Sequence, residues 1–126
     1  MKVIFLVAAG GALGAVTRHL VVQTTSHFAG TSFGWGTLLV NVLGSFIMGL
    51  LAAALLKTVA LEPTLRPLLM TGFLGAFTTF SAFSLDAQRL WERQEILSLF
   101  LYIAASVVLS LASLWAGIRA WRLFQG

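Results

Sequence analysis

The chain contains no cysteine and few charged residues of either sign. Without cysteine it has no disulfides, no thiolate metal sites and no cysteine nucleophile. Only 10% of its 126 residues are charged, whereas 59% are hydrophobic. This composition is too apolar for a soluble domain of this size and is typical of an integral membrane protein. The net charge of +4 then indicates basic loops that face lipid, and we expect no nucleic-acid partner.

Four segments are long and apolar enough to cross a membrane as helices, which takes about 20 residues each. We expect them at about residues 3–22, 36–56, 65–90 and 96–121. The first segment runs on past its glycines and precedes three more spans, so we expect it to be retained rather than cleaved as a signal peptide. The sequence contains no low-complexity tract and no convincing internal repeat. It therefore predicts a single all-α, four-helix transmembrane domain over residues 1–126.

Basic residues are distributed unevenly between the two sides that four spans create. Both termini and the connection between the second and third spans share one side. The basic residues on that side are Lys2, Lys57, Arg66, Arg119 and Arg122, and those on the opposite side are Arg18, Arg89 and Arg93. Five against three leans towards cytoplasmic termini under the positive-inside rule. Insertion in both orientations also remains open.

Four helices enclose little volume, so a polar pathway through them needs shielding by a second copy. Small residues at a spacing of four let helices approach closely. Gly10 and Gly14 have this spacing in the first span, and Ser45 and Gly49 have it in the second. Packing within one chain explains either pair as well as oligomerisation does.

Two spans carry polar stripes. In the second span Thr37, Asn41 and Ser45 fall at i, i+4 and i+8, on one helical face. The stripe in the fourth span consists of Tyr102, Ser106, Ser110 and Ser113. Interhelical hydrogen bonding and a polar passage are equal alternatives for the serines. For Asn41, whose amide costs more to bury, we favour the passage.

Acidic residues are missing from the middle of every span, and the nearest, Asp86, lies towards the end of the third. Proton-coupled transporters usually carry an ionisable group at depth, so its absence favours passive conduction. Arg18, near the end of the first span, either attracts an anion into a vestibule or anchors the helix end by snorkelling.

The third span contains the run TGFLGAFTTFSAFS at residues 71–84, which has the character of a broken helix. Gly72 and Gly75 lack side chains, and Thr78 and Thr79 can satisfy backbone groups locally. A helix break at membrane depth is tolerated only where it is buried in protein or lines a cavity. Freed carbonyls offer hard oxygen ligands, and without an adjacent carboxylate a monovalent cation suits them better than calcium.

Phe80 and Phe83 lie three residues apart and share a face if the chain after the break is helical. The edge of a phenyl ring is electropositive and can receive an anion without a full charge. Core packing is the common alternative for two phenylalanines in a membrane helix, and composition alone does not overturn it.

Three motifs together resemble the Fluc/CrcB fluoride channel family. They are GGALGAVTR at residues 10–18, GTLLVNVLGSF at 36–46 and the run at 71–84. They occur in the expected order and spacing, and length and hydropathy match over the whole chain. The resemblance implies a fluoride-selective channel, not an enzyme, in a prokaryotic plasma (inner) membrane. It also implies a dual-topology homodimer of antiparallel four-helix subunits, each with a broken third helix, surrounded by lipid.

The same resemblance implies roles for individual residues. A structural sodium ion, not transported, would be bound by backbone carbonyls of Gly75 and Thr78 from both subunits. The fluoride path would be lined by Asn41, Phe80, Ser81, Phe83, Tyr102, Ser106 and Ser110. Arg18 and Thr37 would lie at its vestibule.

Two positions depart from the family pattern: Ala76 replaces a frequent second glycine, and Ala82 replaces a common hydroxyl. Backbone ligation tolerates a methyl group at residue 76. Ala82 removes one hydroxyl from the polar path, which would then depend more on Ser81 and the serines of the fourth span. The resulting hypothesis is passive fluoride efflux that lowers cytoplasmic fluoride. The alternatives are a small four-helix proton-coupled exporter and a non-transporting membrane scaffold.

Overall fold

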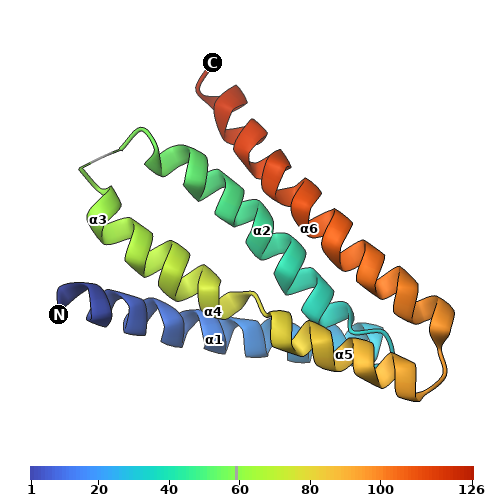
Figure 1. The fold of residues 1–126 in the computed structure, drawn as a ribbon. Helices are drawn as coiled ribbons and strands as arrows, with labels where there is room; N and C mark the ends of the chain where they lie inside the picture. Colours follow the sequence, from blue (N-terminus) through green and yellow to red (C-terminus); the bar gives the residue numbers. More distant parts are fainter. Residues whose placement is uncertain (59) are drawn as a thin grey trace.

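The structure is a computed structural model that describes residues 1–58 and 60–126, and its architecture is helical throughout (Figure 1). Four helical stretches are long and apolar enough to cross a membrane. They are α1 (Lys2–Ala29), α2 (Trp35–Leu55), the stretch Glu62–Glu92, and α6 (Ile96–Phe124). The prediction of an all-α chain with four helices long and apolar enough to span a membrane is therefore confirmed.

The third stretch is assembled from four consecutive elements. It begins with the short α3 (Glu62–Leu65) and continues as a π-helix, η1 (Arg66–Leu74), whose wider turns were not predicted. One further turn, α4 (Gly75–Phe77), precedes two extended residues, Thr78 and Thr79. The helix then resumes as α5 (Phe80–Glu92).

Helix α1 ends seven residues later than predicted. The sequence places its end near Val22 and treats the following Thr, Ser and His residues as a loop. Instead, Thr25 donates its hydroxyl to the carbonyl of Val21 (2.7 Å), a bond within the helix that satisfies the side chain without ending the helix. The helix ends at Gly30, whose φ of 82° suits glycine. Helix α6 likewise runs to Phe124 instead of Trp121.

Glycines set the distances between two helix pairs, α1 with η1 and α2 with α6. A methyl group at Gly10 or Gly14 would overlap the backbone of Leu68 or Phe73 in η1. Likewise, a methyl group at Gly49 would overlap the Leu114 carbonyl of α6. Of the two alternatives for the small-residue pairs, packing within one chain accounts for these three glycines.

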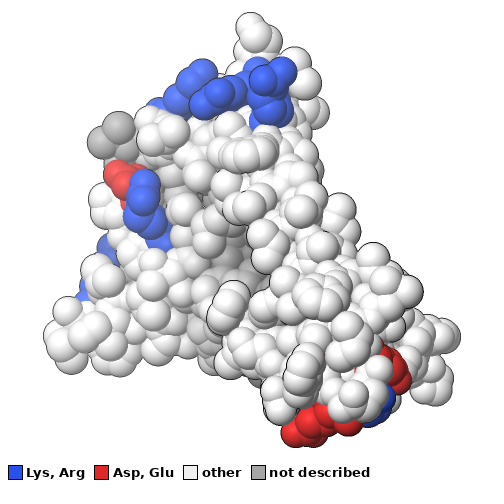
Figure 2. Space-filling view, turned by 45° about the vertical axis from the view of Figure 1, so that its right-hand side comes forward, with Lys and Arg blue, Asp and Glu red and all other residues white. Residues whose placement is uncertain are grey.

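Two small buried clusters lie on either side of Thr78 and Thr79. One joins α2 with η1 and α4 through Val40, Leu74 and Phe77. The other joins α2, α5 and α6 through Leu38, Leu90, Leu99 and Tyr102. Most other large apolar side chains face outward, and charged side chains gather at the ends of the molecule with an uncharged surface between them (Figure 2). This distribution suits a multi-pass membrane protein.

Candidate ion pathway

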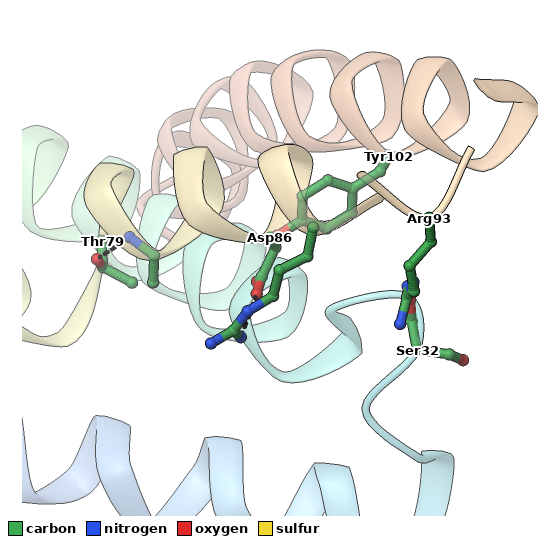
Figure 3. A network of polar contacts seen from close by, with 7 residues as sticks. Ser32, Thr79, Asp86, Arg93 and Tyr102 are labelled. Carbon is green, nitrogen blue, oxygen red and sulfur yellow. Dashed lines mark hydrogen bonds and ion pairs between the residues drawn. The ribbon is translucent and has the colours of Figure 1, made fainter. Parts of the chain in front are cut away.

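The extended residues Thr78 and Thr79 redirect the backbone between α4 and α5. Thr78 has φ −83° and ψ 155°, and Thr79 has φ −151° and ψ 119°. The Thr79 hydroxyl accepts a hydrogen bond from the Ala82 N–H (3.2 Å), which is an ordinary N-cap for α5 (Figure 3). The α5 helix therefore starts anew here, with its own first turn facing residues 78 and 79.

Asn41 of α2 holds Thr79 in this conformation. Its Nδ2 donates to the Thr79 carbonyl (3.0 Å), and its Oδ1 accepts from the Thr79 N–H (2.7 Å). The side-chain amide thus pairs with both backbone groups of one residue, as a neighbouring strand would. We call these two bonds the Asn41 clamp. They join α2 to the third span at the point where helical hydrogen bonding is interrupted.

The clamp and the cap engage two N–H groups that would donate to backbone carbonyls of the third span if its helix were continuous. The Gly75 carbonyl would accept from Thr79, whose N–H goes to Asn41. The Thr78 carbonyl would accept from Ala82, whose N–H goes to the Thr79 hydroxyl. Within residues 1–58 and 60–126 no three His, Cys, Asp or Glu side chains cluster in a way that could hold a metal ion. A cation at this position would therefore depend on carbonyl and hydroxyl oxygens.

A groove of about 380 Å³ opens beside the interruption. Its walls come from α2, from residues 78–80, from α5 and from α6. Six residues that the sequence analysis proposed as ion ligands or pathway residues line it: Asn41, Thr78, Phe80, Phe83, Ser106 and Ser110. Ser45 and Thr79, which were not proposed as site residues, line it as well. The groove thus brings together polar groups from both predicted stripes.

The two phenylalanines differ in their surroundings. Phe80 is 77% exposed, so packing inside this chain does not explain it. Phe83 is half-buried against the cluster that contains Tyr102, with ring centroids 5.4 Å apart in a stacked arrangement. The rings of Phe80 and Phe83 lie 5.3 Å apart at 52° to each other. They form an aromatic edge along the groove, with one ring packed against Tyr102 and the other largely exposed.

Ser106 provides an unpaired hydroxyl in the groove wall. The residue is only 7% exposed, and its Oγ has no hydrogen-bond partner in the described part of the chain. A buried hydroxyl without a partner costs about 1–3 kcal/mol, so such groups generally have a ligand or water. Ser110, one turn further along α6, lines the same groove.

Tyr102 lies outside the residues that line the groove. It is fully buried, and its hydroxyl donates to Asp86 Oδ2 (3.0 Å), as Figure 3 shows. Arg89 Nη1 lies 3.6 Å from Asp86 Oδ1 on the same helix. The sequence analysis considered Asp86 only as the acid nearest a span centre and missed this pairing. The i, i+3 spacing of Asp86 and Arg89 on α5 was an available signal for their ion pair, and no spacing signalled the contact with Tyr102.

Four further predicted residues are not brought to the groove wall. Thr37 is buried in α2, one turn before Asn41. Ser81 is exposed, with its Oγ 3.3 Å from the Thr79 hydroxyl. Arg18 is partly exposed on α1, and Gly75 is exposed on α4. The roles assigned to these residues, to Tyr102 and to the six residues that line the groove all stay predictions.

Comparison with known proteins gives a match over nearly the whole chain. The family model described as "CrcB-like protein, Camphor Resistance (CrcB)" matches residues 5–118. A protein of Rhizobium etli named "Fluoride-specific ion channel FluC" is 51% identical over 93% of this chain and 94% of its own length. Proteins with the same name from Hahella chejuensis and Rhodospirillum centenum are each 50% identical. They cover 93% and 97% of this chain, and 92% and 97% of their own lengths.

Proposed function

The chain belongs to the CrcB-like protein family, and from this membership we propose that it is a fluoride-selective ion channel. The observation that carries the proposal is the identity of about half of the aligned residues, over 93–97% of the chain, with relatives named as fluoride-specific ion channels. The proposal treats the whole chain as one four-helix channel domain in a prokaryotic plasma membrane. Fluoride would leave passively down its own gradient, which lowers fluoride in the cytoplasm.

The groove beside the Asn41 clamp supplies the groups that such a path needs. Fluoride is small and strongly hydrated, so several donors must replace its water at once. The Asn41 amide has two N–H donors and uses one in the clamp, which leaves the other for an anion. The unpaired Ser106 hydroxyl and the hydroxyl of Ser110 add two more. The ring edges of Phe80 and Phe83 provide weak electropositive C–H contacts.

Selectivity would come from the narrowness of this path. Donors fixed by the clamp and by helix packing can close around fluoride but not around the larger chloride, as in other channel filters. None of these groups carries a full positive charge, so the anion is attracted without being trapped. In this proposal Thr37 and Arg18 serve the vestibule, and Ser81 and Tyr102 extend the polar path.

A structural sodium ion fits the carbonyls of Gly75 and Thr78. Both have lost the N–H partner of a continuous helix, and carbonyl oxygen is a suitable ligand for a hard cation. The ion, when bound, would neutralise the partial negative charges of these oxygens. Gly75 is exposed, so a second chain can bring its own two carbonyls to the same ion.

That requirement is one reason to propose a homodimer, in which the third span is the broken helix expected from the sequence. An antiparallel pair with dual topology would place two such spans against each other at the centre. The exposed ring of Phe80 and the many outward apolar side chains offer surface for a second copy and for lipid. The glycines that contact η1 and α6 are already used inside one chain.

Fluoride efflux from liposomes tests the function directly. Purified protein is reconstituted into vesicles loaded with potassium fluoride or potassium chloride, and a potassium ionophore balances the charge. We expect fluoride to leave and chloride to stay, at a rate that does not depend on a pH gradient. Efflux that follows the pH gradient would support the proton-coupled exporter, with Asp86 as its acid, and no efflux of either ion would support the scaffold.

A further inference from the structure

The net charge of the chain lies at one end of the molecule. The end that holds both termini and the α2–α3 connection extends along the left and top of Figure 1. It carries five of the eight basic residues and one of the four acids, Glu62, which pairs with Arg66 (2.7 Å). The rest of the chain carries three basic and three acidic residues. The whole net charge of +4 therefore belongs to the end with the termini.

Charges towards the opposite end neutralise one another locally. Arg89 lies 3.6 Å from Asp86, and Arg93 lies 3.4 Å from Glu95. Arg93 also donates to the carbonyl of Ser32 in the α1–α2 connection (Figure 3). By contrast, no carboxylate within the described residues forms an ion pair with Arg119 or Arg122.

These two arginines share one face of α6 with an aromatic ring. Trp115, Ile118, Arg119 and Arg122 fall at i, i+3, i+4 and i+7, and together they line a surface hollow of about 440 Å³. Trp115 is 65% exposed, and both arginines are exposed. Figure 2 shows Lys and Arg side chains gathered at the top of the molecule, the end at which α6 finishes.

We propose that this hollow binds the phosphate headgroup of an anionic phospholipid. Arginine pairs with phosphate through two parallel N–H bonds, and basic clusters at a span end attract acidic lipids. Tryptophan prefers the membrane interface, where its ring can lie against the upper part of an acyl chain. A second copy of the chain is a poorer occupant, because three of its four acids are already paired with arginine and the fourth, Glu92, accepts a hydrogen bond from Gln88.

Quenching of Trp115 fluorescence by brominated lipids tests the site. The other three tryptophans are changed by Trp35→Phe, Trp91→Phe and Trp121→Phe, and the protein is placed in vesicles of phosphatidylcholine mixed with phosphatidylglycerol. Bromine is carried on one lipid or the other. We expect stronger quenching by brominated phosphatidylglycerol. Each arginine near the surface contributes about fivefold to this preference, so R119Q/R122Q should reduce it by roughly thirtyfold.

A matched variant, R89Q/R93Q, removes two arginines whose charge is already neutralised and should keep the preference. Sodium phosphate should weaken it no more than sodium chloride at equal ionic strength. Equal quenching by both lipids, an unchanged preference in R119Q/R122Q, or selective displacement by inorganic phosphate would each overturn the proposal.

If the tryptophan changes impair folding, the protein with all four tryptophans is equilibrated in mixed micelles and the bound lipid is extracted and counted. The same variants and the same expected ratios then apply. The inference depends on the charge distribution and not on fluoride conduction, so fluoride efflux from the same preparation is a separate result.

Discussion

The Asn41 clamp makes the most specific prediction, because one side chain supplies two hydrogen bonds to one residue. Asn41→Leu keeps the number and branching of the side-chain heavy atoms and removes both bonds to Thr79 without leaving a cavity. Each bond contributes about 1 kcal/mol, and the Thr79 groups left without partners add a desolvation cost. The clamped arrangement should therefore lose about 2–4 kcal/mol, which is roughly a thirtyfold to thousandfold fall in its population.

Two measurements report the loss of the clamped arrangement in Asn41→Leu. Hydrogen exchange of the Thr79 amide should speed up, because its N–H no longer has the 2.7 Å acceptor. Fluoride efflux from liposomes should fall at least tenfold, because the groove loses both its ordering and an amide donor. Ser45→Ala is the control for the exchange measurement, since Ser45 lines the same groove from the same helix but takes no part in the clamp. Wild-type exchange at Thr79 together with wild-type efflux in Asn41→Leu would refute the reasoning.

Three further substitutions test other parts of the structure. Phe80→Ala should reduce fluoride efflux at least tenfold with little effect on thermal stability, because the ring is 77% exposed within the chain; full efflux in liposomes would remove it from the path. Gly14→Ala should destabilise the fold by about 1–3 kcal/mol, seen as a lower melting temperature, because a methyl group would overlap the Phe73 backbone. Gly11→Ala, whose added methyl group would lie 3.9 Å from its nearest neighbour, should leave the melting temperature unchanged. Tyr102→Phe should destabilise the fold by about 1–3 kcal/mol, because Asp86 loses a buried donor; an unchanged melting curve would contradict the pairing.

Much of the architecture was predictable because hydropathy acts over whole helices. The number of spans and the start of α6 follow from long apolar runs, which are too hydrophobic to form exposed loops. The end of α1 was not predictable in the same way. Thr25 occurs in loops and in helices, and in the structure its hydroxyl bonds to the Val21 carbonyl within the continuing helix.

The groove was partly predictable from helical spacing. The intervals on α2 and α6 correctly placed Asn41, Ser106 and Ser110 on faces that meet. Spacing on one helix could not reveal that the Asn41 amide pairs with Thr79, 38 residues away. Nor could it reveal that Tyr102 turns from its own stripe towards Asp86 on a different helix.

The glycine contacts have a consequence for the dimensions of the groove. They hold α1 against η1 and α2 against α6, so each pair is a unit of nearly fixed width. The groove lies between the α2–α6 pair and residues 78–83 of the third span, and at its wall Gly44 of α2 faces Thr78 with no room for a methyl group. The distance between α2 and the third span, and not the packing within either pair, therefore sets the width of the groove. Gly44→Ala should therefore change the width of the groove while leaving the distances within the α1–η1 and α2–α6 pairs unchanged.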